Sequence, residues 1–338
     1  MRTIVLEEPG RLALANRPAP EAPRPGEALV RIHRVGVCGT DIHAFRGHQP
    51  FFSYPRVVGH ELGVEVVAVG AGVSGLRPGD RCAVEPYLHC GSCAACRRGK
   101  TNCCSALQVL GVHIDGGMQE QLLVPAAKLH RSERLSFDQL ALVEMLTIGA
   151  HAVRRAALSL GENVLVIGAG PIGLSVAQLA GLSGARVAVL EISAWRREFC
   201  GRQLGIARLL DGSGEVGRQL EGMFGGELPT TVFDATGSAA SMMRAVEYVE
   251  HGGTLVYVSL VQGDIAFRDT ELHRRELSLL RSRNALAADF RWVLSMVEDG
   301  RIDLGPWITH RAPAERAADE FPGWLVPDRG VVKAVVEF

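Results

Sequence analysis

The fold of the second half of the chain is indicated by one stretch of sequence, Asn163-Val-Leu-Val-Ile-Gly168-Ala169-Gly170-Pro171-Ile172-Gly173. Its first five residues form an apolar run typical of a buried strand, and its glycines form a GxGxxG motif. Residues 174–182 have helical apolar spacing, and a second strand-like run, 186–190, is followed by the acidic Glu191. A strand, a glycine turn, a helix and a second strand ending in an acid are together typical of a dinucleotide-binding βαβ unit.

Each part of this motif has an expected role. Gly168 makes the turn, Gly170 lets a pyrophosphate approach the backbone, and Gly173 lets the helix pack against the strand. The helix begins near Pro171 and Ile172, so its N-terminus faces the phosphates.

The acid at the end of the second strand bears on the choice of coenzyme. Glu191 should accept hydrogen bonds from the adenosine ribose and repel a 2′-phosphate, which favours NAD over NADP. Arg196 and Arg197 follow closely and could instead bind that phosphate, so NADP remains the alternative.

The rest of this half continues the alternation of strands and helices. Strand-like runs lie at 207–211, 231–236, 253–260 and 277–282, and a helical segment lies at 239–251. This alternation predicts an α/β fold with a doubly wound parallel sheet. Thr236 and Ser259 fall at or after strand ends, where such sheets bind ligands.

The first part of the chain has a different pattern. Short β-branched runs, split by Gly and Pro, lie at 28–33, 63–69, 81–85 and 120–124, and the run 331–338 is again strand-like. We therefore expect a β-rich domain over 1–148, a dinucleotide-binding domain over 149–286 and a segment over 287–338 that returns to the first domain. The hinge is expected near 149–151.

Five of the eight cysteines lie within fifteen residues. Cys90, Cys93, Cys96 and Cys104 have the spacing of a closed four-thiolate zinc site, which leaves no position for substrate and is structural. The lobe around them, 88–105, lacks a core of its own, so metal binding would supply its folding energy. An iron–sulfur cluster and a redox-active thiol pair are the alternatives, and Cys103 is an extra neighbour.

A second set of residues predicts an open zinc site. Cys38 and His60 could ligate the metal, and Glu61 or Glu144 could complete the sphere while one position stays open for water or substrate. Taken singly, a cysteine or histidine of this kind is more often a core residue. Thr40 and His43 suit a relay that carries a proton away from the site.

Composition excludes several classes of protein. The 338 residues carry a formal net charge of −1 and are 47% hydrophobic, which excludes a globally disordered chain and gives no support to binding of nucleic acid or a membrane surface. The uncharged stretch 163–185 is long enough to span a bilayer, but its glycines fit a strand, a turn and a buried helix better. The N-terminus does not have the pattern of a secretory signal, so we expect a cytoplasmic protein.

Taken together, these motifs make the chain resemble the zinc-dependent medium-chain alcohol dehydrogenase family over essentially its full length. The resemblance rests on Cys38-Gly-Thr-Asp, Gly59-His-Glu, the four-cysteine lobe, Gly168-Ala-Gly-Pro-Ile-Gly and the segment Val143–His151. It implies a GroES-like catalytic domain and a Rossmann domain, with two zinc ions per chain and NAD. It also implies a catalytic zinc held by Cys38, His60 and one of the two glutamates, the relay through Thr40 and His43, and homodimers or homotetramers.

The resemblance also narrows the substrate. A glutamate at 144 resembles the polyol and sugar-acid branch of the family rather than the ethanol branch, which has cysteine there. The block Leu110–Met118 and Ser282-Arg-Asn284-Ala are similar to sugar-acid dehydrogenases of the L-galactonate or L-gulonate type. Candidates to hold a substrate carboxylate or hydroxyl are Arg46, His48, His113 and Arg283. One departure is Met145, which stands where relatives usually have proline; it frees φ and restores an N–H.

The expected activity is therefore hydride transfer from a secondary alcohol of a sugar acid or polyol to NAD. The alternatives are an NADP(H)-dependent alcohol or aldehyde reductase, an enzyme similar to L-threonine 3-dehydrogenase, and a noncatalytic zinc protein that senses the redox state of a dinucleotide. The last would not need the set formed by Cys38, Thr40, His43, His60 and Glu144.

Overall fold

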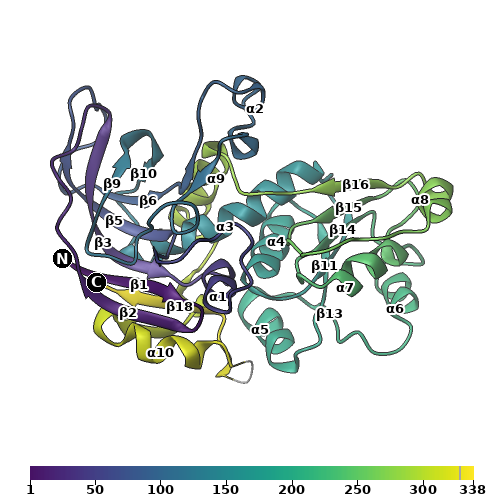
Figure 1. Cartoon of the computed structure of the whole chain (residues 1–338). Helices are drawn as coiled ribbons and strands as arrows, with labels where there is room; N and C mark the ends of the chain where they lie inside the picture. Colours follow the sequence, from purple (N-terminus) through teal and green to yellow (C-terminus); the bar gives the residue numbers. More distant parts are fainter. Residues whose placement is uncertain (327–328) are drawn as a thin grey trace. The chain divides into compact units, whose positions relative to one another are not determined.

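The computed structural model describes residues 1–326 and 329–338. The chain divides into two compact units (Figure 1), with unit 1 formed by 1–145 and 286–338 and unit 2 formed by 146–285. The sequence predicted the corresponding boundaries at 148 and 286. The division after Met145 falls inside helix α3 (Phe137–Ala156), so the expected hinge at 149–151 lies within a continuous helix.

Unit 2 is built on a six-stranded sheet whose neighbouring strands are all parallel, in the order β13-β12-β11-β14-β15-β16. In chain order this is 3-2-1-4-5-6, the strand order of the Rossmann fold. The strands are β11 (Asn163–Ile167), β12 (Arg186–Leu190), β13 (Arg208–Leu210), β14 (Thr231–Asp234), β15 (Thr254–Tyr257) and β16 (Ser278–Arg281). Every residue of β11 is buried, as in a central parallel strand that is covered on both faces.

Five α-helices of unit 2 connect these strands. They are α4 (Pro171–Leu182), α5 (Ala194–Leu204), α6 (Val216–Met223), α7 (Ala239–Arg244) and α8 (Asp269–Arg275). The helix expected over 239–251 is shorter, because α7 passes into the 3-10 turn η3 (Ala245–Tyr248). One apolar core joins side chains of α6, α7 and η3 to those of the sheet, among them Leu220, Met242 and Leu165.

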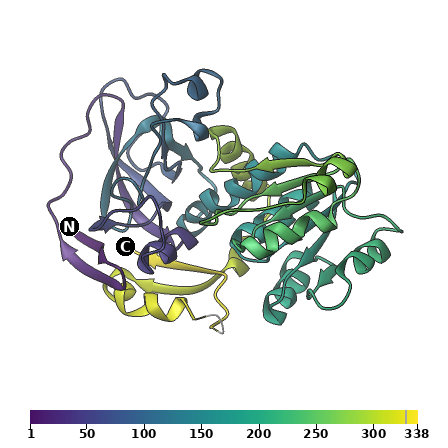
Figure 2. The same cartoon turned by 45° about the vertical axis from the view of Figure 1, so that its right-hand side comes forward.

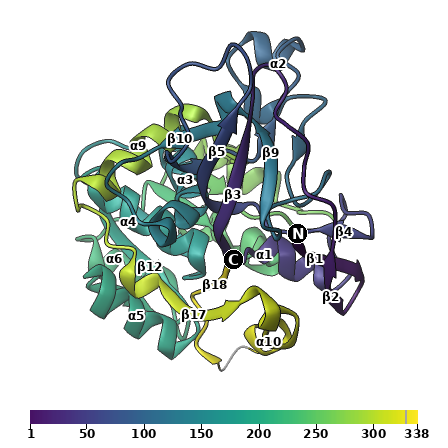
Figure 3. The same cartoon turned by 90° about the vertical axis from the view of Figure 1, so that its left-hand side faces the viewer.

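Unit 1 is built on a sheet in the order β10-β6-β5-β3-β18-β17, with β9 also paired to β3. Figure 3 shows β3, β5 and β9 side by side and the C-terminal strand β18 reaching β3. The strands are β3 (Glu27–Gly36), β5 (Glu61–Val69), β6 (Arg81–Val84), β9 (Gln121–Pro125), β10 (Leu129–Arg131), β17 (Ile308–Pro313) and β18 (Lys333–Glu337).

Two smaller sheets and several helices complete unit 1. The sheets join β2 (Arg11–Asn16), β1 (Arg2–Glu8) and β4 (Arg56–Val57), and β7 (Tyr87–Leu88) with β8 (Gln108–Val109). The α-helices are α1 (Gly39–Phe45), α2 (Ala94–Arg97), α3, α9 (Ala287–Glu298) and α10 (Ala317–Trp324). The 3-10 turns are η1 (Thr101–Cys103), η2 (Ala126–Lys128), η4 (Gly305–Trp307) and η5 (Ala314–Arg316).

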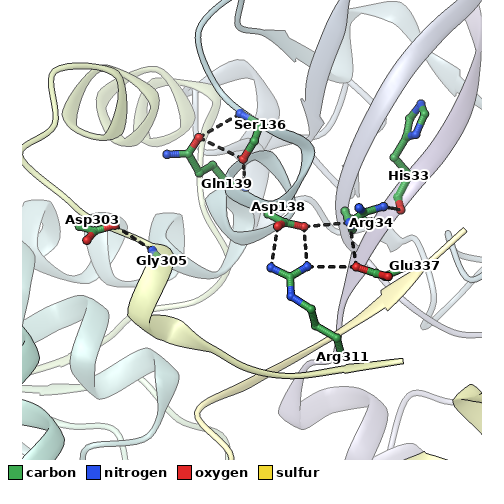
Figure 4. Close-up of polar contacts among 9 residues, drawn as sticks. All are labelled: His33, Arg34, Ser136, Asp138, Gln139, Asp303, Gly305, Arg311 and Glu337. Carbon is green, nitrogen blue, oxygen red and sulfur yellow. Dashed lines mark hydrogen bonds and ion pairs between the residues drawn. The ribbon is translucent and has the colours of Figure 1, made fainter. Parts of the chain in front are cut away.

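The C-terminal segment is part of unit 1. Figure 2 shows it, in yellow, beside the purple N-terminal strands, and Phe321 and Trp324 of α10 share a core with Ile4 and Leu6 of β1. An ion-pair network ties four elements together here (Figure 4). Asp138 at the start of α3 accepts from Arg34 of β3 and Arg311 of β17, and Arg311 also contacts Glu337 of β18.

No helix in the described part of the chain has the length and hydropathy needed to cross a membrane. The uncharged stretch 163–185 instead forms β11 and the 12-residue helix α4, joined by the glycine turn.

Candidate active site

The glycine motif of unit 2 has the geometry that its sequence predicts. Gly168, just after β11, has a φ of +92°, a conformation that residues with a Cβ rarely adopt. A Cβ on Gly173 would lie 1.8 Å from the carbonyl oxygen of Gly168, so only glycine allows α4 to start this close to the strand. Gly170 is the N-cap of α4 and Pro171 its first residue. The N-terminus of α4 therefore lies at the carboxyl end of β11, where a phosphate can bind.

Glu191 and Arg196 both contact this turn. The Glu191 side chain is mostly buried, and its two carboxylate oxygens accept hydrogen bonds from the backbone N–H groups of Ala169 (2.7 Å) and Ser193 (2.8 Å). Arg196 Nη1 donates to the carbonyl oxygen of Ala169 at 3.2 Å. The acid predicted to meet the ribose thus lies directly against the glycine turn, and so does the arginine that represents the NADP alternative.

Thr236 and Ser259 follow neighbouring strands of the same sheet. Thr236 lies two residues after β14 and donates from Oγ1 to Asp234 Oδ1 at 2.7 Å. Its Cγ2 would be 3.1 Å from a Cβ on Gly168, so it borders the glycine turn. Ser259 lies two residues after β15, and a Cβ on Gly237 would be 4.0 Å from the Ser259 Cβ. Both residues lie where a doubly wound sheet binds its ligand.

The four cysteines of the lobe form one group in unit 1. The sulfur atoms of Cys90, Cys93, Cys96 and Cys104 all lie within 4.8 Å of one another. Backbone N–H groups point at three of these sulfurs: Cys93 N at Cys90 Sγ, Cys96 N at Cys93 Sγ and Cys90 N at Cys104 Sγ. The hydrogen bond from Cys96 N is the largest of the effects that lower the pKa of the Cys93 thiol to about 5. Four cysteine sulfurs this close together suit a structural zinc ion, which binds cysteine as the thiolate. Cys103 is exposed and lies outside the group.

A second group joins Cys38, His60 and Glu61 in unit 1, with one ligand atom of each within 4.8 Å of the others. Cys38 is the N-cap of α1, and Glu61 is the first residue of β5, directly after His60. Asp41 holds the two segments together, because its carboxylate accepts from Cys38 N at 2.9 Å and Gly59 N at 3.2 Å.

The residues of this second group fit a zinc ion. A thiol, an imidazole and a carboxylate are the donors that catalytic zinc takes from proteins. The imidazole of His60 is buried, and its Nδ1 has no hydrogen-bond partner among the described residues; the nearest carboxylate oxygen, of Asp41, is 4.0 Å away. Burial alone would lower the pKa of His60, but Cys38, Asp41 and Glu144 outweigh it and raise that pKa well above its usual value. The negative groups around His60 therefore favour a positive charge at this group of residues.

Glu144 of α3 lies close enough to His60 for their charges to interact, but it is not in the group of three. It is buried and accepts a hydrogen bond from the hydroxyl of Tyr87. Burial raises the pKa of Glu144 to about 7, and the charge of His60 opposes that shift. Sequence reasoning left the two glutamates as equal candidates, and the structure brings Glu61 nearer to the thiol and the imidazole.

Two residues of the pocket were missed by sequence reasoning: Tyr87 and Lys333. Lys333, the first residue of β18, is only 2% exposed, and its Nζ lies 2.7 Å from each carboxylate oxygen of Glu61. Burial would lower the pKa of Lys333, but the charges of Glu61 and Cys38 raise it, so the lysine is protonated. The one signal for it in the sequence was a single charge in the apolar run Val331–Val336.

The predicted relay residues lie on one helix. Thr40 and His43 are three positions apart on α1, which places them on the same face. Burial, followed by the charges of Arg46 and His48, lowers the pKa of His43, so the imidazole is neutral and able to accept a proton at neutral pH.

The substrate candidates are distributed over both units. Arg46 is exposed and its Nη2 lies 3.4 Å from the carbonyl oxygen of Leu325, and the exposed His48 follows α1. His113 accepts a hydrogen bond from Val109 N at 3.1 Å and its ring stacks on Phe51 at 6.2 Å. Arg283 belongs to unit 2 and lies two residues after β16.

Met145 does not interrupt α3, which runs unbroken from Phe137 to Ala156. Its side chain is 1% exposed and lies in the core directly after Glu144. The N–H that a proline would lack is present at this position.

Comparison with known proteins gives matches over the whole chain. A model of the alcohol dehydrogenase GroES-like domain matches residues 24–134, and a model of the zinc-binding dehydrogenase domain matches residues 171–299. L-galactonate-5-dehydrogenase of Escherichia coli K12 is 42% identical over 340 residues, covering 100% of this chain and 99% of its own.

Solved structures agree with these matches. One from Escherichia coli CFT073, described as a short chain alcohol dehydrogenase (rspB) complexed with NADH, has a TM-score of 0.93 and 31% identity, with 100% of this chain and 99% of the other covered. A zinc-binding dehydrogenase of Sinorhizobium meliloti 1021 bound to NADP has a TM-score of 0.91 and 28% identity, with the same coverage. The predicted fold class, a GroES-like domain with a Rossmann domain, is confirmed.

Proposed function

The chain belongs to the zinc-binding alcohol dehydrogenase family, and from that premise we propose that it oxidises a secondary hydroxyl of a sugar acid or polyol with NAD as hydride acceptor. The observation that carries this proposal is the group of the half-buried Cys38 with the buried His60 and Glu61, whose donor atoms fit zinc. We assign unit 1 to catalysis and unit 2 to coenzyme binding.

The roles of the residues follow from their contacts. Cys38, His60 and Glu61 would hold the catalytic zinc, Glu144 lies beside them, and Cys90, Cys93, Cys96 and Cys104 would hold the structural zinc. When bound, zinc would polarise the substrate oxygen and NAD would accept the hydride. Thr40 and His43 lie on the same face of α1, so Thr40 would relay the hydroxyl proton toward His43. The lowered pKa of His43 keeps its imidazole neutral, and its exposure would let the proton reach water.

The glycine turn of unit 2 would bind the coenzyme. Gly168, Gly170 and Gly173, with Pro171 and Ile172 at the start of α4, would receive the pyrophosphate. The carboxylate of Glu191 lies against this turn, where it would repel a 2′-phosphate, and this supports NAD. Thr236 and Ser259, at neighbouring strand ends, would border the nicotinamide half.

NADP is the second candidate coenzyme. Arg196 also contacts the turn through Ala169, and a related solved structure holds NADP. An NADP(H)-dependent reductase would bind the 2′-phosphate through this arginine.

A sugar acid is the substrate class that we favour. A relative that this chain matches over 99% of its length is an L-galactonate-5-dehydrogenase, and Arg46, His48, His113 and Arg283 are the candidates to bind a carboxylate. Arg is suited to this task because its fork pairs with both oxygens of a carboxylate.

We also propose that the enzyme is a homodimer or homotetramer in the cytoplasm. Strand β16 is the last strand of its sheet, and Leu279 on β16 and the nearby Leu260 are exposed, at 42% and 61%. An open edge with apolar side chains supports pairing with a second copy. None of the eight cysteines, all of which lie among the described residues, is in a disulfide, and this suits a reducing compartment.

The experiment is to follow NADH formation by the zinc-loaded protein with L-galactonate and with galactitol, which has a hydroxymethyl group in place of the carboxylate. We expect oxidation of the sugar acid with a kcat/KM at least about tenfold above that for the polyol, as the loss of a charged hydrogen bond predicts. Equal or better rates with galactitol would exclude recognition of the carboxylate and would indicate a sorbitol-type polyol dehydrogenase. A panel with L-threonine and simple alcohols tests the remaining alternatives.

A further inference from the structure

Lys333 carries its charge in the interior of unit 1, where water cannot solvate the ammonium group. Its side chain is 2% exposed, and Nζ lies 2.7 Å from Glu61 Oε1, 2.7 Å from Glu61 Oε2 and 3.1 Å from the carbonyl oxygen of Val37. An ammonium group has three N–H bonds, and here each of them has an acceptor. A buried charge of this kind is costly unless every donor is satisfied, so the arrangement fixes the lysine in one position.

The contacts of Lys333 join the two segments that carry the zinc candidates. Val37 directly precedes Cys38, and Glu61 directly follows His60. The lysine comes from the other end of the chain, on β18, which pairs with β3 through Val335 and Gly36; the backbone of Val37 also donates to Ala334 O at 2.9 Å. One side chain from β18 thus holds the spacing between the N-cap of α1 and the start of β5.

The carboxylate of Glu61 has little freedom to turn away from this contact. Gly36 lies opposite Glu61 in the register of β3 and β5, and a Cβ on Gly36 would be 2.2 Å from Glu61 Oε2. The carboxylate therefore occupies a slot between the bare backbone of Gly36 and the ammonium of Lys333. Glu144, in the same part of unit 1, accepts a hydrogen bond from the neutral hydroxyl of Tyr87.

We propose that Lys333 is a positioning residue for the catalytic metal: it orients the Glu61 carboxylate beside Cys38 and His60 and offsets its charge. This inference rests on the proposed zinc site. It adds Lys333 as the residue that orients Glu61 to be the carboxylate ligand of the metal. The lysine does not touch substrate or coenzyme in this account. It acts on the metal through Glu61.

The test is the metal affinity and the visible spectrum of the cobalt-substituted enzyme in wild type, Lys333→Met and Lys333→Arg. Removing a partner that orients a ligand commonly reduces metal affinity 10- to 100-fold. We expect the metal affinity of the Cys38 site, measured by competition with a chelator, to fall at least about tenfold in Lys333→Met. We also expect the cobalt absorption bands of this variant to change. Lys333→Arg, which keeps the cation and its donors, should recover most of the affinity and the wild-type spectrum.

A double variant keeps the test decisive if Lys333→Met leaves too unstable a protein, because Glu61→Gln with Lys333→Met removes both buried charges together. If Lys333 acts through Glu61, this pair should bind cobalt as Glu61→Gln does alone. Wild-type affinity and spectrum in Lys333→Met would overturn the proposal, and so would a further loss on adding Lys333→Met to Glu61→Gln. A wild-type chain that holds metal only in the four-cysteine lobe would instead refute the proposed zinc site itself.

Discussion

The hydroxyl of Tyr87 hydrogen-bonds the carboxylate of Glu144, and both side chains are almost completely buried. Tyr87 lies on β7, three residues before the first cysteine of the lobe, and Glu144 lies in the middle of α3. The contact therefore links the backbone that leads into the four-cysteine lobe to the pocket that holds Cys38 and His60.

Replacing Tyr87 by phenylalanine should remove one hydrogen-bond donor from the buried carboxylate of Glu144. We expect a loss of about 1–3 kcal/mol in the free energy of unfolding and a fall of about 10- to 100-fold in kcat/KM. Urea unfolding and steady-state kinetics measure the two effects. The control is Tyr248→Phe, which removes the hydroxyl of a buried tyrosine in unit 2. A Tyr87→Phe enzyme with unchanged kcat/KM would show that Glu144 needs no hydrogen bond from this residue.

The structural zinc can be tested with two neighbouring cysteines. Cys96 belongs to the group of four sulfurs and Cys103 does not. We expect Cys96→Ser to bind one zinc fewer per chain. We also expect trypsin to cleave faster after the exposed Arg97 and Arg98, because the lobe has no core of its own and would unfold locally without the metal. Cys103→Ser should bind as much zinc as wild type and resist trypsin equally. Equal zinc contents in the two variants would contradict the assignment. Metal analysis and timed proteolysis give the result.

Stability should depend on pH through the network around Asp138. The hydrogen bonds and charge of Arg311, together with Arg34, hold the pKa of Asp138 below its usual value of 3.8. The folded state thus keeps this carboxylate ionised where the unfolded state takes up a proton, so the stabilisation is full above about pH 4 and is lost as the pH falls through the lowered pKa. We expect Asp138→Asn to be about 1 kcal/mol less stable at neutral pH, a small value because the pair is partly exposed. The difference should disappear in acid; a constant difference across the acid range would exclude this origin.

The choice of coenzyme should depend on Glu191. Glu191→Ala removes a carboxylate that holds the glycine turn through Ala169 and that is proposed to meet the ribose. We expect KM for NAD to rise about tenfold or more and the preference for NAD over NADP to fall, since hydrogen bonds to charged groups contribute about 1.5–3 kcal/mol. Glu198→Ala, on an exposed turn of α5 beside Arg202, is the matched control. An unchanged ratio of the two kcat/KM values would place the discrimination elsewhere.

The sequence predicted correctly the parts of the molecule whose structure is determined by residues within a few positions of one another. The strand, glycine turn and helix over 163–182 lie where the motif indicated, because the steric demands of Gly168 and Gly173 act within a few residues. The four cysteines lie together for the same reason, since two-residue spacers bring the first three thiols close.

What the sequence did not predict depends on distant segments. Lys333 reaches Glu61 across 272 positions, and only the pairing of β18 with β3 brings the two residues together. Tyr87 meets Glu144 across 57 positions, and a tyrosine before a cysteine cluster has no local pattern that indicates this partner. Glu61, and not Glu144, is grouped with the thiol of Cys38 because the start of β5 lies beside the start of α1. The spacing of these residues along the chain does not predict this arrangement.

We infer that turnover depends on metal held by Cys38, separately from the metal of the four-cysteine lobe. The most direct measurement is zinc content together with NADH formation from L-galactonate in wild type and Cys38→Ala. The account predicts two zinc ions and activity in wild type, and one zinc ion with turnover abolished in Cys38→Ala while Cys90, Cys93, Cys96 and Cys104 keep theirs. A Cys38→Ala protein that retains turnover, or that loses both zinc ions while still folded, would contradict it.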